Sequence, residues 1–139
     1  MSKWICPRDG KKMTNVPIQQ KLGYLYSGGC YLLCLAHYFG QDEDILKLYD
    51  YFLKKGYIDE DCFVKDPVSI VKYLSGNNYT VEKTTTKPTL QPNDFIVEYW
   101  YNPRTKLHHF TLPDWDSLGF STTRKEGVIE SYRYFKRKI

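Results

Sequence analysis

The hydrophobic period changes near the middle of the chain, and this change constrains the fold more than any other feature. Up to Asn78, apolar residues recur at helical spacing, and from Tyr79 onward β-branched and aromatic residues gather in short runs. The predicted helices follow Cys30, Asp42 and Asp66, and the predicted strands are residues 79–83, 95–101, 106–112 and 128–135. Helices first and strands afterwards indicate an α+β fold, with N-terminal helices packed on one side of a C-terminal antiparallel sheet.

Short signals mark the ends of these elements. Gly40 and Gly56 follow the first two helical runs where a left-handed cap is expected, and Pro67 suits the first position of the third helix. Residues 102–105, Asn-Pro-Arg-Thr, separate two strands by the length of a hairpin loop. We therefore expect these two strands to pair antiparallel.

The length of the chain indicates one domain. A chain of 139 residues that is 42% hydrophobic can bury a single core, so we expect one domain over residues 1–139. Its parts are a leader (1–15), a helical part (16–78) and a sheet part (79–139). No apolar run reaches 18 residues and the leader lacks a signal-peptide core, so we expect no membrane span and a cytoplasmic location.

Positive charge is concentrated at the C-terminal end. From Arg124 onward six basic residues face two acidic ones, a balance of +4 that equals the charge of the whole chain. No nucleic-acid-binding motif accompanies them, so a nucleic-acid partner is not expected. We interpret the basic residues as a solvated edge strand that lysines keep from pairing, with adhesion to an anionic cell wall as the alternative.

The four cysteines do not suggest a disulfide framework or a metal site. Cys30 and Cys34 lie four residues apart on one helix, and a chain of this size does not need covalent cross-links, so reduced thiols are expected. Cys6 belongs to half of a zinc knuckle that has no second half. We expect neither a metal nor a cofactor.

Cys30 is the strongest candidate for a reactive group. Gly28-Gly29 precede it, and a two-glycine turn would deliver it to the first turn of an apolar helix. The unpaired N–H groups and the positive dipole at a helix N-terminus favour a thiolate there. His109 follows on a predicted strand, and Asp114 and Asp116 come after it. A cysteine, a later histidine and an acid form a common nucleophilic set.

Several neighbouring residues have simpler interpretations. Cys34 is predicted to be a small core residue, because cysteine is among the most buried residue types. His108 and His109 point to opposite faces of their strand, so only one of them can face Cys30. His37 lies on the same helical face as Cys30 but seven residues along, and we expect it to serve in packing.

The chain resembles the papain-like cysteine peptidases, especially the bacteriocin-processing branch. The residues that carry this resemblance are Val16-Pro17, Gln20, Gly29-Cys30, Leu35-Ala36, Tyr38-Phe39-Gly40 and the run from His109 to Leu112. The run after Cys30 and the ending Gly127 to Arg133 also resemble a small family of uncharacterised phage- and plasmid-borne proteins assigned to the same fold. The resemblance implies a papain-like fold and a central strand that carries the histidine.

The resemblance also assigns roles to four residues. It implies that Cys30 is the nucleophile, His109 the general base and then acid, Asp116 the group that orients the imidazole, and Gln20 a donor to the oxyanion. Asp116 requires a tight hairpin with Asp114 at its tip; Asp114 itself and a backbone carbonyl remain alternatives for the orienting role.

Two functions follow as expectations. The first is a cysteine-dependent amide hydrolase, either a peptidase or a peptidoglycan amidase, that forms a thioester on Cys30 and takes a peptide or cell-wall peptide substrate. The second is a non-catalytic papain-like binding module of phage or plasmid origin that acts on a host protein and keeps Cys30 as a structural residue. Phage origin would also allow release from the cell.

Overall fold

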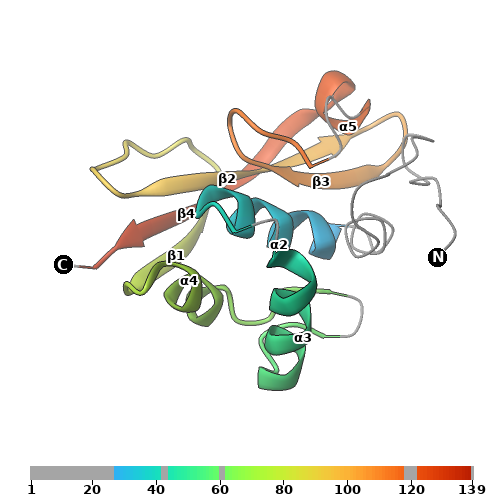
Figure 1. The fold of residues 1–139 in the computed structure, drawn as a ribbon. Helices are drawn as coiled ribbons and strands as arrows, with labels where there is room; N and C mark the ends of the chain where they lie inside the picture. Colours follow the sequence, from blue (N-terminus) through green and yellow to red (C-terminus); the bar gives the residue numbers. More distant parts are fainter. Residues whose placement is uncertain (1–26, 42–43, 60–61, 118–121, 139) are drawn as a thin grey trace, which may run out of the picture.

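In the described part of the chain, three helices precede a sheet, as the change of period predicts. The computed structural model describes residues 27–41, 44–59, 62–117 and 122–138. Figure 1 shows these helices on one side of the sheet and a further short helix at its other side. The elements are α2 (Ser27–Tyr38), α3 (Ile45–Lys55), α4 (Pro67–Ser75), β1 (Tyr79–Thr84), β2 (Phe95–Asn102), β3 (Leu107–Thr111), α5 (Thr122–Glu126) and β4 (Val128–Arg137).

Most predicted helix ends are confirmed. Gly56 ends α3 with a φ of 78°, a left-handed conformation that glycine adopts without steric cost. Pro67 opens α4, and the Asp66 carboxylate accepts a hydrogen bond from the backbone N–H of Ser69 at 3.1 Å. The α+β class and the positions of all four strands are likewise confirmed.

The starts of two helices differ from the prediction. Helix α2 begins at Ser27, so the glycine pair lies inside the helix instead of forming a turn before it. Each glycine in a helix costs about 1 kcal/mol relative to alanine, and the complete burial of the following apolar residues offsets this cost. Helix α3 takes Asp44 as its N-cap without a side-chain hydrogen bond, and Asp42 lies outside the described residues.

The four strands form one antiparallel sheet in the order β1-β4-β2-β3. The prediction that the basic residues form a solvated edge strand is therefore wrong, because β4 pairs with β1 on one side and with β2 on the other. Phe135 of β4 is fully buried and stacks on Phe95 of β2, with ring centroids 4.7 Å apart. Burial of this ring fixes β4 in the middle of the sheet, while Lys136 of β4 and Lys138 just after it stay exposed.

Strand β3 lies at the edge of the sheet among the described residues, and not at the centre as the family resemblance implied. Helix α2 packs along β3, and the Cys34 thiol donates a hydrogen bond to the Phe110 carbonyl at 3.5 Å. A backbone carbonyl of the edge thus has a partner on the helix, which is one way to cover an edge strand.

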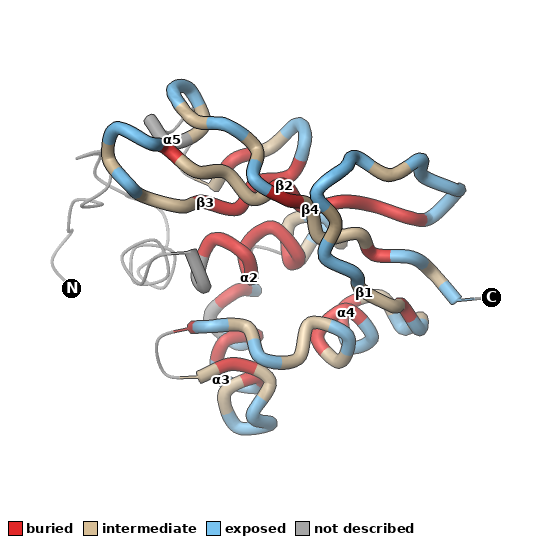
Figure 2. Tube along the Cα trace, turned by 180° about the vertical axis from the view of Figure 1, so that it is seen from behind, coloured by how far each residue is buried: buried red, intermediate tan, exposed pale blue. Residues whose placement is uncertain are grey.

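The core lies between the helices and the sheet. The buried stretches of α2, α4 and the central strands face one another in Figure 2, and exposed residues lie on the outer turns. Tyr31 of α2 stacks on Phe110 of β3 with centroids 4.4 Å apart, so helix and sheet are joined by aromatic packing. No helix in the described ranges has the length and apolar character needed to cross a membrane.

The predicted hairpin joins β2 and β3 and is built around Asn102. The side-chain oxygen of this fully buried residue accepts hydrogen bonds from the N–H groups of Arg104 at 2.9 Å and Thr105 at 3.3 Å. Its amide group donates to Glu126 of α5 at 3.2 Å, and Glu126 also pairs with Arg104 at 2.6 Å. Helix α5, which no sequence signal predicted, is thereby attached to the hairpin.

Candidate active site

Cys30 and His109 meet where α2 approaches strand β3. Cys30 is the fourth residue of α2, and His109 is the third residue of β3. The Cys30 Sγ and the His109 Nδ1 are 2.9 Å apart, and both side chains are fully buried. His108 points to the other face of the strand, where its ring stacks on Tyr99 and lies 3.6 Å from the Glu130 carboxylate.

Asp116 reaches the second nitrogen of the same imidazole. The His109 Nε2 and the Asp116 Oδ1 are 2.6 Å apart, with the two side chains 0% and 1% exposed. Leu112 and Trp115 form a two-way backbone pair, so Pro113 and Asp114 occupy the tip of a tight turn. Asp114 is exposed there, and the chain returns Asp116 to the histidine. Of the two acids considered, Asp116 is the one beside His109.

The turn that carries Asp116 is held from two sides. Trp115 stacks on His37 at the end of α2, with ring centroids 3.9 Å apart and planes 6° from parallel. On the other side, the Arg124 guanidinium of α5 donates to the Pro113 carbonyl at 2.8 Å. His37 thus packs against the turn, and α2 and α5 together fix the position of Asp116.

The two partners decide the charge of His109. Burial by itself lowers the pKa of an imidazole, because it disfavours the charged form. Here the negative charge of Cys30 and the hydrogen bonds to Asp116 and Cys30 outweigh burial and raise the pKa of His109 to about 9. A doubly protonated ring can donate from Nδ1 to sulfur and from Nε2 to the carboxylate at once. The geometry therefore suits a thiolate–imidazolium pair beside a carboxylate.

Cys34 occupies a different environment four residues further along α2. It is fully buried, and burial raises the pKa of its thiol well above the usual range, with the nearby charge of Cys30 acting in the same direction. Its hydrogen bond to the Phe110 carbonyl requires the protonated thiol as donor. These features describe a structural thiol, in agreement with the interpretation of Cys34 as a core residue.

Three polar residues next to His109 had no role in the sequence analysis. Trp100 pairs with His109 across the two strands, and its Nε1 donates to the Thr111 Oγ1 at 3.0 Å. Glu98 pairs with Thr111 and is only 7% exposed, so burial raises the pKa of its carboxyl group. A single acid within the apolar run from Phe95 to Trp100 was the signal that could have singled it out.

Other sequence predictions fall partly outside the described residues. Gln20, the expected oxyanion donor, and Cys6 both lie in the part that is not described. None of the described cysteines, Cys30, Cys34 and Cys62, forms a disulfide. Within residues 27–41, 44–59, 62–117 and 122–138, no three His, Cys, Asp or Glu side chains converge in a way that could hold a metal ion.

Comparison with known proteins places the chain in a family without assigning a reaction. No curated protein and no solved structure matches it at a significant level. The sequence model of one family, described as "Protein of unknown function, DUF261", matches residues 16–137, which include Cys30, His109 and Asp116. This match covers most of the chain, and the protein therefore belongs to the DUF261 family.

Proposed function

We propose that this protein is a cysteine-dependent amide hydrolase with a papain-like fold, acting as a peptidase or a peptidoglycan amidase. One observation carries the proposal: the buried series from the Cys30 Sγ through both nitrogens of His109 to the Asp116 carboxylate, with contacts of 2.9 and 2.6 Å. A nucleophile, a base bonded to it and a third group that orients the base are the parts that covalent amide hydrolysis needs.

The proposed reaction has two halves. In the first, the Cys30 thiolate attacks the amide carbonyl carbon, and the C–N bond breaks as His109 gives its Nδ1 proton to the departing amine. In the second, the neutral His109 takes a proton from water, the resulting hydroxide attacks the thioester, and the C–S bond breaks. A carboxylic acid leaves, and Cys30 and His109 return to the thiolate and imidazolium. Gln20 is the proposed donor to the oxyanion in both halves.

Asp116 is proposed as the group that orients the ring. A hydrogen bond from Nε2 to the Asp116 carboxylate directs Nδ1 at the sulfur and stabilises the imidazolium in an environment that excludes water. The carboxylate is held by the turn whose position depends on His37 and Arg124, so its direction is fixed before a substrate arrives.

A binding module is the second candidate, and the burial of the site is the observation that favours it. Cys30 and His109 are both 0% exposed, and a side chain without access to solvent serves naturally as an internal hydrogen-bonding group. In this alternative the protein binds a host protein and never forms a thioester. Its affinity for that partner would then survive the change Cys30→Ser.

The first test measures how alkylation of Cys30 by iodoacetamide depends on pH, with each thiol read by mass spectrometry. The ratio of the rate near pH 10 to the rate near pH 6 largely cancels the effect of burial, which slows both rates. For an ordinary thiol of pKa about 8.5 this ratio is about 300, because only the thiolate reacts. For Cys30 beside an imidazolium we expect a ratio below about 5, rising steeply in His109→Ala. A ratio above about 100 in wild type would contradict the ion pair.

The second test searches for the substrate class. Digests of denatured proteins and purified muropeptides are incubated with wild type and with Cys30→Ala, and new amine and carboxyl termini are identified by mass spectrometry. We expect the wild type, and not Cys30→Ala, to release products from one of the two pools. We also expect a thioester adduct on Cys30 in acid-quenched samples of the wild type. An intact Cys30–His109 ion pair without products or adduct from either pool would favour the binding module.

A further inference from the structure

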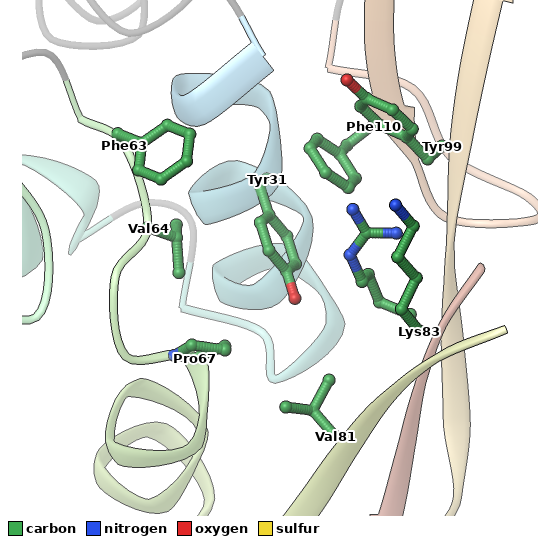
Figure 3. A pocket seen from close by; sticks show the side chains of 9 residues that line it. Tyr31, Phe63, Val64, Pro67, Val81, Lys83, Tyr99 and Phe110 are labelled. Atoms are coloured by element: carbon green, nitrogen blue, oxygen red, sulfur yellow. The ribbon is translucent and has the colours of Figure 1, made fainter. Parts of the chain in front are cut away.

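A cavity of about 410 Å³ opens between the helices and the sheet, apart from the Cys30–His109 site. Tyr31 of α2 and Pro67 of α4 line it on the helical side, and strands β1 to β4 each contribute at least one side chain to the opposite wall. Figure 3 shows these side chains around one open space. Neither Cys30, His109 nor Asp116 is among the lining residues, so a ligand in this cavity would not occupy the proposed catalytic centre.

The hydroxyl group of Tyr31 lacks a partner inside this cavity. Tyr31 is 7% exposed, and its buried oxygen has no hydrogen-bond partner within the described part of the chain. In Figure 3 this hydroxyl points into the space bounded by Pro67, Val81 and Lys83. Burying an unpaired hydroxyl costs free energy, and native proteins keep few such groups. A ligand that accepts a hydrogen bond from Tyr31 would remove this cost.

Two cations line the same cavity. Lys83 of β1 and Arg133 of β4 are direct cross-strand partners, an arrangement in which like charges repel. The Arg133 guanidinium donates to the Ser131 hydroxyl at 2.9 Å and lies over the rings of Tyr99 and Phe110 at 5.2 and 5.3 Å. Among the described residues neither cation has a carboxylate within ion-pair distance. Their charges are thus available to an anion.

The remaining walls are apolar. Val64 and Pro67 lie on the helical side of the cavity, and Val81, Tyr99 and Phe110 lie on the sheet side. Phe63 also lines the cavity and is 60% exposed, which is unusual for so large an apolar side chain. A ligand with an aromatic or branched aliphatic body would cover Phe63 and fill the space between these walls.

We propose that this cavity binds a small organic carboxylate whose apolar body contacts the aromatic walls and whose carboxylate accepts hydrogen bonds from Tyr31 and Arg133, with Lys83 as a second positive charge. The size is typical of small-molecule sites, and the combination of apolar walls with a few convergent polar groups is what such sites require. A carboxylate suits the site because it accepts charge-assisted hydrogen bonds from guanidinium, ammonium and hydroxyl groups together. It can belong to a small acid or to the C-terminus of a peptide.

The test measures binding to the full chain by isothermal titration calorimetry with two matched pairs of probes. The first pair is 4-phenylbutyrate and its neutral amide, and the second is N-acetyl-Ala-Phe and its C-terminal amide. We expect at least one acid to bind about tenfold more tightly than its amide, because only the acid forms the charge-assisted bonds. A preference for the first acid would identify a small-molecule ligand, and a preference for the second would identify a peptide C-terminus.

Three variants and one control variant locate the binding site. Lys83→Gln and Arg133→Gln should remove most of the preference for the acid, whereas Lys136→Gln, which changes an exposed cation further along β4, should keep it. Tyr31→Phe should raise the midpoint of urea denaturation without ligand, because it removes an unpaired buried hydroxyl. The same variant should bind the acid severalfold more weakly than the wild type does. Lys83→Gln and Tyr31→Phe carry the test if Arg133→Gln does not fold. Equal affinity for acid and amide, or no binding of either pair at millimolar concentration, would overturn the proposal.

Discussion

Replacing Asp116 with asparagine removes one buried negative charge and keeps the shape of the side chain. In the wild type this charge lies 2.6 Å from the His109 Nε2 and is shielded from solvent on all sides. The pKa of His109 is raised from 6.5 to about 9 in the folded protein, so the imidazolium stabilises the fold fully below pH 6.5. This stabilisation is lost as the pH rises through about 9. We therefore expect Asp116→Asn to destabilise the protein at low pH and not at high pH.

The size of the effect follows from the same values. A rise from 6.5 to about 9 corresponds to about 3 kcal/mol, at about 1.4 kcal/mol for each pH unit. Cys30 and Asp116 share this stabilisation, so removing the charge of Asp116 should cost about 1–3 kcal/mol near pH 6. Breaking a buried ion pair costs about 3–5 kcal/mol when one partner is deleted, and the amide oxygen that remains in asparagine lowers this cost.

The assay is urea denaturation of wild type and Asp116→Asn near pH 6 and near pH 10. Asp114→Asn is the matched control, because Asp114 is exposed at the tip of the same turn. We expect the loss of unfolding free energy in Asp116→Asn to fall to about zero near pH 10. The unfolding free energy of the control should stay within about 0.5 kcal/mol of wild type at both pH values. An equal loss at both pH values, or none near pH 6, would refute the electrostatic account of His109.

Four further outcomes are expected. Hydrolysis, once a substrate is found, should decline as the pH rises through about 9, because His109 then lacks the proton for the departing amine; a pH–rate profile without this alkaline limb would contradict that role. Phe135→Ala should cost about 3–5 kcal/mol in urea denaturation, whereas Val128→Ala, at an exposed site of the same strand, should cost under about 0.5 kcal/mol. Asn102→Ala should cost about 1–3 kcal/mol and speed amide exchange in the hairpin, since two backbone N–H groups lose their acceptor. Glu98→Gln should raise the free energy of unfolding near pH 7 and leave it unchanged near pH 3. Burial raises the pKa of the Glu98 carboxyl group, so the buried negative charge destabilises the wild type only at pH values above this pKa.

Local sequence signals were sufficient where neighbours along the chain decide the structure. Pro67, Gly40 and Gly56 act on their own turns, and the turn from Leu112 to Trp115 is closed by adjacent residues, so each could be predicted. The contact of His109 with Asp116 is of this kind, because only seven residues separate them.

Long-range pairing could not be predicted in the same way. Whether a basic strand lies at the edge or at the centre of a sheet depends on where Phe135 finds an aromatic partner, and Phe95 is 40 residues away. The sequence shows Glu98 only as an acid within an apolar run, and its surroundings, Thr111 and Trp100, are brought together by the folded sheet. Helix α5 is too short to show a period, and its place is fixed by single contacts of Arg124 and Glu126.

The central place of β4 has a consequence for how the protein is made. Strand β1 has β4 as its only partner in the described sheet, and β4 is the last of the four described strands to be synthesised. The β2–β3 hairpin and α2 can bring His109 and Cys30 together early, because all three precede β4 in the chain. Until translation reaches Arg137, however, β1 and the open side of β2 stay unpaired and exposed to other chains. A nonsense mutation before Val128 should therefore leave a protein that keeps Cys30 and His109 but aggregates.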